Sequence, residues 1–194
     1  MHPTEGAFID LSRQLANVAA QVSLAYNQAQ GQLGLESVLT PQRLSTQETT
    51  QASLQVLSQL RDLTDKHKEL YSQFMEKAST AMQQEIAKMP AAQQDQYRVG
   101  IAVTLHDHLS AQLDFYRDRE EWINIAVELC SFVDERRSTI QFEEGALLFE
   151  TDAEIGQFND LIARLDEIHH REVALLESRK ACALRAAMYL GATN

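Results

Sequence analysis

Apolar residues recur every three or four positions along most of the chain, which is the spacing of helices that bury one face. Clear breaks occur at Gly31 and Gly34, at Pro90, and in an irregular stretch at about residues 138–150. The pattern predicts one medium and three long helices, at about residues 5–30, 45–88, 91–137 and 151–190. Because short connections make consecutive helices antiparallel neighbours, we predict an all-α fold: a single-domain, elongated up-down bundle with coiled-coil-like packing.

Residues at the helix ends support these limits. Ser45 with Glu48, and Thr151 with Glu154, have the spacing of a capping box, in which each side chain satisfies the other residue's backbone amide. Pro90 ends a helix because it lacks an amide hydrogen and restricts the residue before it. At about residues 138–150 we expect an ordered loop held by apolar anchors, with a short strand as the alternative.

Each long helix carries an apolar seam that we expect to be buried. In the second helix the heptad-like seam is Leu60, Leu63, His67, Leu70 and Phe74. In the third helix it is Val99, Val103, His106, Leu109, Leu113, Tyr116, Glu120, Ile123, Val127, Cys130 and Val133. The later half of that helix adds Trp122, Ile125, Leu129 and Phe132, which places this half at the centre of the bundle. The last helix has a main stripe of Phe158, Ile162, Leu165, His169, Val173, Leu176, Ala183, Ala187 and Leu190, and a second edge of Leu161, Ile168, Leu175 and Cys182.

The chain is acidic, with a net charge of −11 at pH 7. Such a surface repels phosphate backbones and anionic lipids, so we expect neither nucleic acid nor membrane as a partner. Five carboxylates lie within twelve residues that contain no Lys or Arg: Glu143, Glu144, Glu150, Asp152 and Glu154. They fit either a solvated loop and the acidic first turn of a helix, or a docking strip for a protein partner with a basic surface.

The N-terminal residues, the lengths of the apolar stretches and the cysteines bear on the cellular compartment. The first five residues show no basic segment followed by an apolar run, so we expect no signal peptide. No stretch approaches the roughly 20 apolar residues of a membrane span. Cys130 and Cys182 lie in separate helices without zinc-type spacing, as expected for reduced, buried thiols. We therefore expect a cytoplasmic protein.

Three histidines, His67, His106 and His169, each lie on a predicted seam of one long helix. Folding the chain at Pro90 sets His67 level with about Leu113, and folding it near residue 145 sets His169 level with about Glu121. At 1.5 Å per residue, His106 is then roughly 10 Å from His67 and roughly 20 Å from His169 along the bundle. A three-histidine zinc site is therefore disfavoured, and separate hydrogen-bonded histidines are expected.

The same register predicts that Glu120 lies near His169, which would form a pH-sensitive contact. It also leaves open a ferritin-like metal site built from Glu120, Glu128, His169 and Glu172. The Glu-x-x-His spacing of Glu167 and His170 occurs once, on the polar side of its helix, whereas a di-iron bundle needs two copies. We predict no catalytic residue, no metal ligand and no cofactor.

Long seams, an acidic surface and the lack of a recognisable reaction centre indicate a non-enzymatic protein–protein interaction module. An adaptor, an assembly subunit, a secretion-associated protein and an inhibitor or immunity-type protein fit this pattern equally. A ferritin-like bundle and a rod that binds lipid surfaces are the alternatives. Because an unused seam on a rod commonly pairs with a second copy, the pattern leaves a homo-oligomer open, with a dimer favoured.

Overall fold

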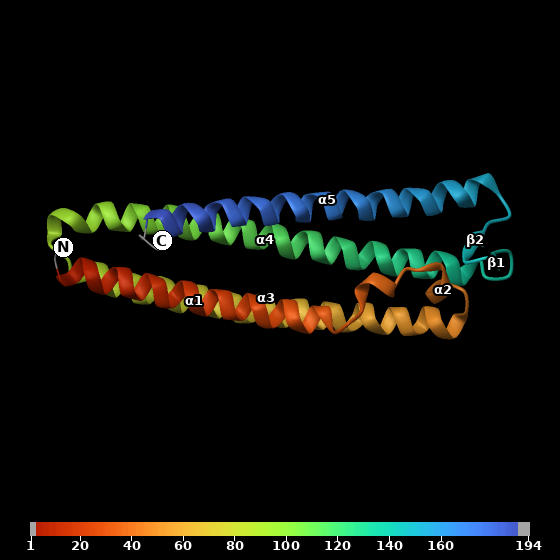
Figure 1. The fold of residues 1–194 in the computed structure, drawn as a ribbon, viewed down its shortest axis with the longest axis horizontal. Helices are drawn as coiled ribbons and strands as arrows, with labels where there is room; N and C mark the ends of the chain where they lie inside the picture. Colours follow the sequence, from red (N-terminus) through yellow and green to blue (C-terminus); the bar gives the residue numbers. More distant parts are fainter. Residues whose placement is uncertain (1–2, 190–194) are drawn as a thin grey trace.

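The computed structural model describes residues 3–189, with side chains for residues 5–181, and it confirms the elongated all-α bundle (Figure 1). The four principal helices are α1 (Pro3–Gly31), α3 (Gln47–Ala87), α4 (Ala91–Glu135) and α5 (Asp152–Tyr189). Short elements connect them: the 3-10 turn η1 (Leu35–Ser37), helix α2 (Pro41–Leu44), and strands β1 (Gln141–Glu143) and β2 (Ala146–Leu148). The predicted end of the last helix at residue 190 lies outside the described residues.

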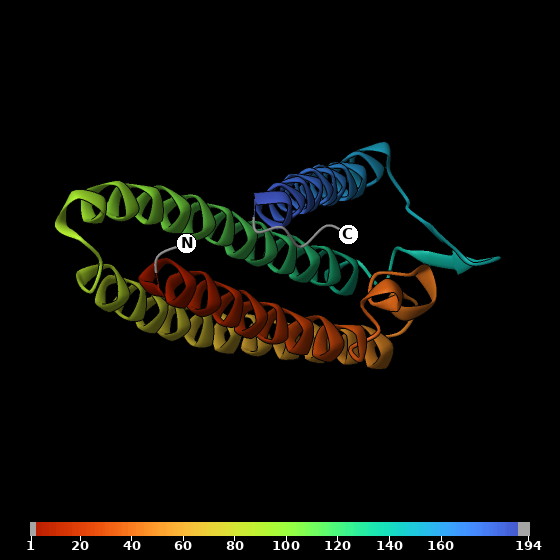
Figure 2. The same ribbon diagram turned by 60° about the vertical axis from the view of Figure 1, so that its left-hand side comes forward.

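The long helices pack in chain order as antiparallel neighbours. Helix α3 contacts both α1 and α4, and α5 packs on α4, as Figures 1 and 2 show. Across the Pro90 turn, the Tyr116 hydroxyl lies 2.9 Å from Nδ1 of His67, three residues from the predicted level of Leu113. Across the second turn, Arg171 bonds Glu121, two residues from the predicted level of His169. The positions of the two turns therefore predicted the register of both helix pairs to within two or three residues.

The main hydrophobic core lies at the end of the rod that carries the hairpin. It contains Val38, Leu44, Leu57, Ile125, Ala126, Leu129, Cys130, Phe132, Val133, Leu161, Leu165 and Ile168. The predicted second seam of α4 is confirmed here, because Ile125, Leu129 and Phe132 are buried and Trp122 packs against the core. By contrast, the first buried residue of α4 is Gln112, so the first 21 residues of that helix, 91–111, are only partly covered.

The main predicted seam of each long helix is buried over part of its length and exposed over another part. On α4, the early part of the first seam is exposed, because Ile101, Leu105 and Gln112 form the side turned toward α3. On α5, buried residues come from both predicted stripes: Leu165 from the main stripe, and Leu161 and Ile168 from the second edge. Cys182, Ala183, Ala187 and Leu190 lie outside the residues whose side chains are described. Three later members of the predicted main stripe are exposed: His169, Val173 and Leu176. On α3, Leu70 is exposed and its neighbour Tyr71 is buried. In each case two apolar faces lay side by side, and helical spacing alone did not rank them.

One predicted cap is confirmed and one is wrong. The amide of Glu154 donates to Oγ1 of Thr151, and the amide of Thr151 donates to Oε2 of Glu154, each at 3.2 Å. At the start of α3, the box is instead formed by Thr46 and Thr49. Ser45 is instead the C-cap of α2: its backbone is helical, whereas an N-cap is extended, and its hydroxyl donates to the carbonyl of Gln42.

The segment at about residues 138–150, where we expected an ordered loop or, as the alternative, a short strand, contains two short strands that form a β-hairpin. Strands β1 and β2 pair antiparallel, with Phe142 opposite Leu147. The two turn residues, Glu144 and Gly145, have φ of 48° and 83°, the left-handed conformation that a tight hairpin turn requires. Apolar anchors do hold the segment: Ile140, Leu147 and Phe149 are half-buried against the main core.

The location of the core gives a stability prediction. Leu129 is completely buried in the main core, so Leu129→Ala should lower the free energy of unfolding by about 2–5 kcal/mol. Leu24 is more than half exposed on α1, so the matched change Leu24→Ala should stay within about 0.5 kcal/mol of wild type. Urea unfolding followed by circular dichroism measures both, and equal losses would contradict the position of the core.

Candidate functional site

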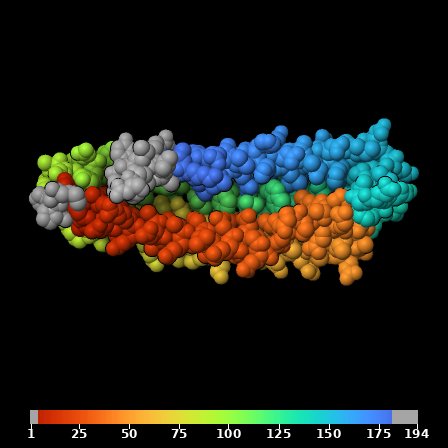
Figure 3. All heavy atoms as spheres, in the orientation of Figure 1, coloured from red at the N-terminus to blue at the C-terminus, as the bar shows by residue number. Residues whose placement is uncertain are grey.

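The hairpin and the start of α5 lie at the same end of the rod (Figure 3), and both carry acidic and apolar residues. Four of the predicted docking residues, Glu143, Glu144, Glu150 and Asp152, are exposed. Three large apolar side chains are exposed beside them in the sequence: Phe142 at 40 %, Leu148 at 44 % and Ile155 at 41 %. We call these seven residues the hairpin-end surface.

The pairing of the strands separates two faces of the hairpin. Successive side chains of a strand point to opposite faces, and directly paired residues share a face. Phe142 and Leu147 therefore share one face, on which Leu147 packs against the core and Phe142 stays 40 % exposed. Leu148 lies on the other face, together with Gln141 and Glu143. A hollow of about 330 Å³ lies at the base of the hairpin and is lined by Ser138, Thr139, Gln141, Leu148, Phe149 and Glu150. Apolar and carboxylate groups thus border the same depression.

The charges of this surface are largely uncompensated. Within the described chain, Glu143, Glu144, Glu150 and Asp152 form no ion pair, and residues 138–154 contain five acidic and no basic side chains. The fifth predicted residue, Glu154, has a structural task, because it caps α5 and lies 3.8 Å from Nε of Arg136. The acidic strip therefore consists of four free carboxylates and one helix cap.

Of the three seam histidines, only His67 lies in the core. Its ring is 6 % exposed and is surrounded by the aromatic rings of Tyr26, Tyr71, Phe115 and Tyr116. Its Nδ1 bonds the Tyr116 hydroxyl, whereas its buried Nε2 has no hydrogen-bond partner among the described residues. Burial and, to a smaller extent, the nearby charge of Arg179 lower its pKa. His67 is therefore a neutral core residue near pH 7.

The other two histidines, His106 and His169, are exposed and do not meet His67. The expected contact between Glu120 and His169 is not formed: both residues are exposed, and no ion pair joins them in the described part of the chain. The charge near His169 is instead Glu172, one turn along the same helix. The register was predicted closely, but neither side chain points at the α4–α5 contact.

The four residues of the ferritin-like set do not converge. Glu128 is bonded to Arg164 at 3.1 Å, and Glu172 lies 3.0 Å from Arg119. Burial raises the pKa of Glu172, and the positive charge of Arg119 partly offsets this. Among the side chains of residues 5–181, no three His, Cys, Asp or Glu residues come close enough together to hold a metal ion.

The sequence analysis missed a layer of charged residues between α4 and α5. Asp118 and Arg119 are buried, although they lie in a run of charged residues that looks like a solvated face. Asp118 accepts from Nε of Arg171 at 3.2 Å, and Arg119 pairs with Glu172. The available signal was the spacing of Arg171, Glu172 and Arg179, which places charges on the predicted apolar face of α5.

Comparisons with known proteins supply no family. No protein-family model matches the chain, and no match was found among curated proteins or solved structures. Within the described residues, none of the helices has a segment apolar enough to span a lipid bilayer. The hairpin-end surface is therefore assigned as the candidate site on the geometry of this chain alone.

The environment of His67 predicts a pH-dependent stability. Because the folded-state pKa of His67 is below the ordinary value of 6.5, the unfolded chain binds the proton first as the pH falls. This contribution to stability is complete above pH 6.5 and is lost below it, at up to about 1.4 kcal/mol per pH unit. The free energy of unfolding, measured between pH 7.5 and 5.5, should fall for wild type and less steeply for His67→Gln.

The exposed His108 provides the control for this experiment. The variant His108→Gln carries the same change outside the core and should keep the pH dependence of wild type. Equal slopes for wild type and His67→Gln would show that His67 does not titrate differently in the folded and unfolded chain.

Proposed function

We propose that the protein is a non-enzymatic protein–protein interaction module whose hairpin-end surface docks a basic, amphipathic segment of a partner protein. The observation that carries this proposal is that exposed Leu148 shares its face of the hairpin with Glu143 and lines the same hollow as Glu150. Phe142, Ile155, Glu144 and Asp152 are also exposed at this end, and none of the four carboxylates has an ion-pair partner in the described chain. Exposed apolar groups rimmed by charge are typical of protein-binding surfaces.

The chemistry of the surface defines the partner. Lys or Arg side chains would face Glu143, Glu144 and Glu150, and an apolar side chain would enter the hollow beside Leu148 and Phe149. Charges of this kind increase the association rate and select partners more than they increase affinity, and salt screens them. Binding should therefore weaken as the salt concentration rises, without disappearing, because the apolar contacts remain.

We place this activity in the cytoplasm. Cys130 is a free and completely buried thiol, and burial raises its pKa to about 11. Such a thiol is protonated and unreactive at neutral pH. A buried, unpaired cysteine fits a reducing compartment, and this supports the proposed cytoplasmic location.

A charge-reversal variant tests the proposal. Tagged wild-type protein is used to capture partners from the native host, and each partner is identified by mass spectrometry and purified. The variant Glu143→Lys/Glu144→Lys/Glu150→Lys should bind that partner at least tenfold more weakly by calorimetry, because three attractive charges become repulsive. Circular dichroism verifies the fold of the variant.

A matched variant controls for total charge. Asp62, Asp65 and Glu76 are exposed on α3, away from the hairpin, and Asp62→Lys/Asp65→Lys/Glu76→Lys makes the same change in net charge. This control should bind within about twofold of wild type. A partner that binds both variants and wild type alike would overturn the hairpin-end surface as the docking site.

A further inference from the structure

The first half of α4 exposes an apolar seam that no element of the described chain covers. Its members are Val99, Ala102, His106, Leu109 and Leu113, with the alternating 3-4 spacing of a coiled-coil contact. Val99 is 65 % exposed, Leu109 41 % and Leu113 61 %, and the adjacent Val103 is 56 % exposed. We call these six residues the α4 stripe. It is continuous over 15 residues, which is about 21 Å of helix.

Among the side chains of residues 5–181, none from the neighbouring helices is seen to cover this face. The side of α4 that faces α3 is formed by Ile101, Leu105 and Gln112. On another side, the Arg179 side chain of α5 donates a hydrogen bond to the carbonyl of Ala111 on α4. The α4 stripe lies between these two contact faces. Its spacing matches that of a helix seam that packs against another helix, so its occupant is a helix of similar length.

The stripe is symmetric in sequence about His106. Val99 and Leu113 each lie seven residues from His106, and Val103 and Leu109 each lie three residues from it. An antiparallel copy with its two-fold axis at His106 would therefore set Val99 level with Leu113 and Val103 level with Leu109. A two-fold interface requires a surface that is complementary to itself, and this one meets that requirement.

The charges at both ends of the stripe obey the same symmetry. Asp95 is paired with Arg98 at 3.3 Å, and Asp114 is paired with Arg117 at 2.9 Å. Asp95 and Arg117 are both eleven residues from His106, and Arg98 and Asp114 are both eight residues from it. In the antiparallel arrangement each aspartate is thus level with an arginine of the second copy, whereas a parallel pair would set like charges level.

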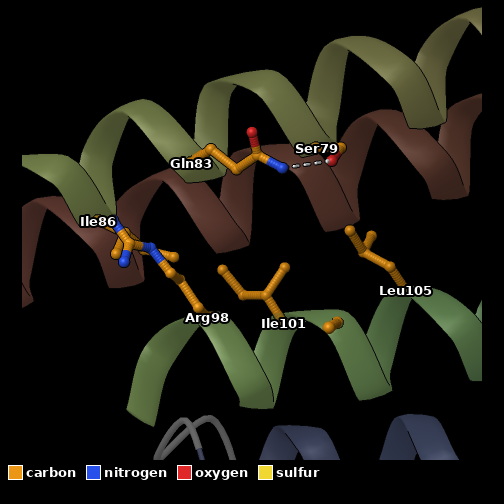
Figure 4. A pocket seen from close by; sticks show the side chains of 7 residues that line it. Ser79, Gln83, Ile86, Arg98, Ile101 and Leu105 are labelled. Carbon is orange, nitrogen blue, oxygen red and sulfur yellow. Dashed lines mark hydrogen bonds between the residues drawn. The ribbon is translucent and has the colours of Figure 1, made fainter. Parts of the chain in front are cut away.

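A cavity beside the stripe provides a matching recess. It has a volume of about 580 Å³ and lies between α3 and α4, lined by Ser79, Gln83, Ile86, Arg98, Ile101, Ala102 and Leu105 (Figure 4). Leu109 follows Leu105 by one turn, so it lies on the cavity side of the stripe. A two-fold axis perpendicular to the two helices places the Leu109 flank of the second copy on the same side of the helix pair as the Leu109 flank of the first. Leu109 of the second copy therefore comes level with the cavity, between Ala102 and Leu105.

From these observations we infer that the α4 stripe is a homodimer interface, in which a second copy of this chain packs antiparallel with its two-fold axis at His106. A helix pair of this length buries on the order of 500 Å² per copy, less than the roughly 800 Å² of a standard interface. The dimer is therefore weak, with a Kd in the micromolar range. It places the two hairpin-end surfaces at opposite ends of the assembly, and it does not depend on what they bind.

A pair of histidine variants tests the position of the axis. His106→Glu sets two carboxylates opposite each other at the two-fold axis and should raise the dimer Kd at least tenfold in sedimentation equilibrium. His108→Glu introduces the same charge two residues away, on another side of the helix, and should dimerise as wild type does. A wild type that stays monomeric to several hundred micromolar, or equal effects of the two variants, would overturn the inference.

A charge swap tests the antiparallel direction. Asp95→Arg alone and Arg117→Asp alone set like charges level in their own homodimers and should weaken them. A mixture of the two variants should form a heterodimer of at least wild-type affinity, because both pairs are then attractive. A mixture no better than either variant alone would contradict the arrangement. The charge-reversed hairpin variant should still dimerise, so failure of one proposal is distinguishable from failure of the other.

Discussion

The packing of the second half of α4 between α3 and α5 is the interaction on which the rest of the structure depends. Ile125, Leu129 and Phe132 are buried here, and residues from α2, α3 and α5 complete the same core. Apolar burial is the dominant favourable term in folding, and in this chain it is concentrated at one end of a long rod. At the Pro90 end, α4 packs less extensively against its neighbours, because its first 21 residues include no buried side chain.

This uneven packing explains what the sequence could and could not predict. Breaks in the helical pattern are local signals, so folding the chain at Pro90 and near residue 145 gave the register to within two or three residues. The choice between two adjacent apolar faces depends on which neighbour is present. Spacing alone could not show that Leu109 is exposed or that Asp118 is buried. The acidic strip was visible in the sequence, but its apolar companions became apparent only when the segment was seen to be a hairpin.

Because the packing is uneven, the hairpin end and the Pro90 end of the rod expose different surfaces. At the anchored end, the core holds Leu147 and Phe149, which fixes the hairpin and leaves Phe142 and Leu148 exposed beside free carboxylates. At the other end, α4 is covered on one side by α3 and keeps an apolar seam outside. The docking of a partner and the pairing with a second copy that we propose would therefore use separate surfaces. A dimer that presents two hairpin ends would bind a repetitive partner with increased avidity.

Hydrogen–deuterium exchange of the dilute monomer, resolved along α4, tests the central claim most directly. Backbone amides buried in a stable core exchange only when that core opens, whereas thinly covered helix opens locally at lower cost. The account predicts slow exchange over residues 122–133 and exchange at least tenfold faster over residues 95–110. Uniform protection along α4, or stronger protection near Pro90 than near the hairpin, would show that the main core does not anchor the rod.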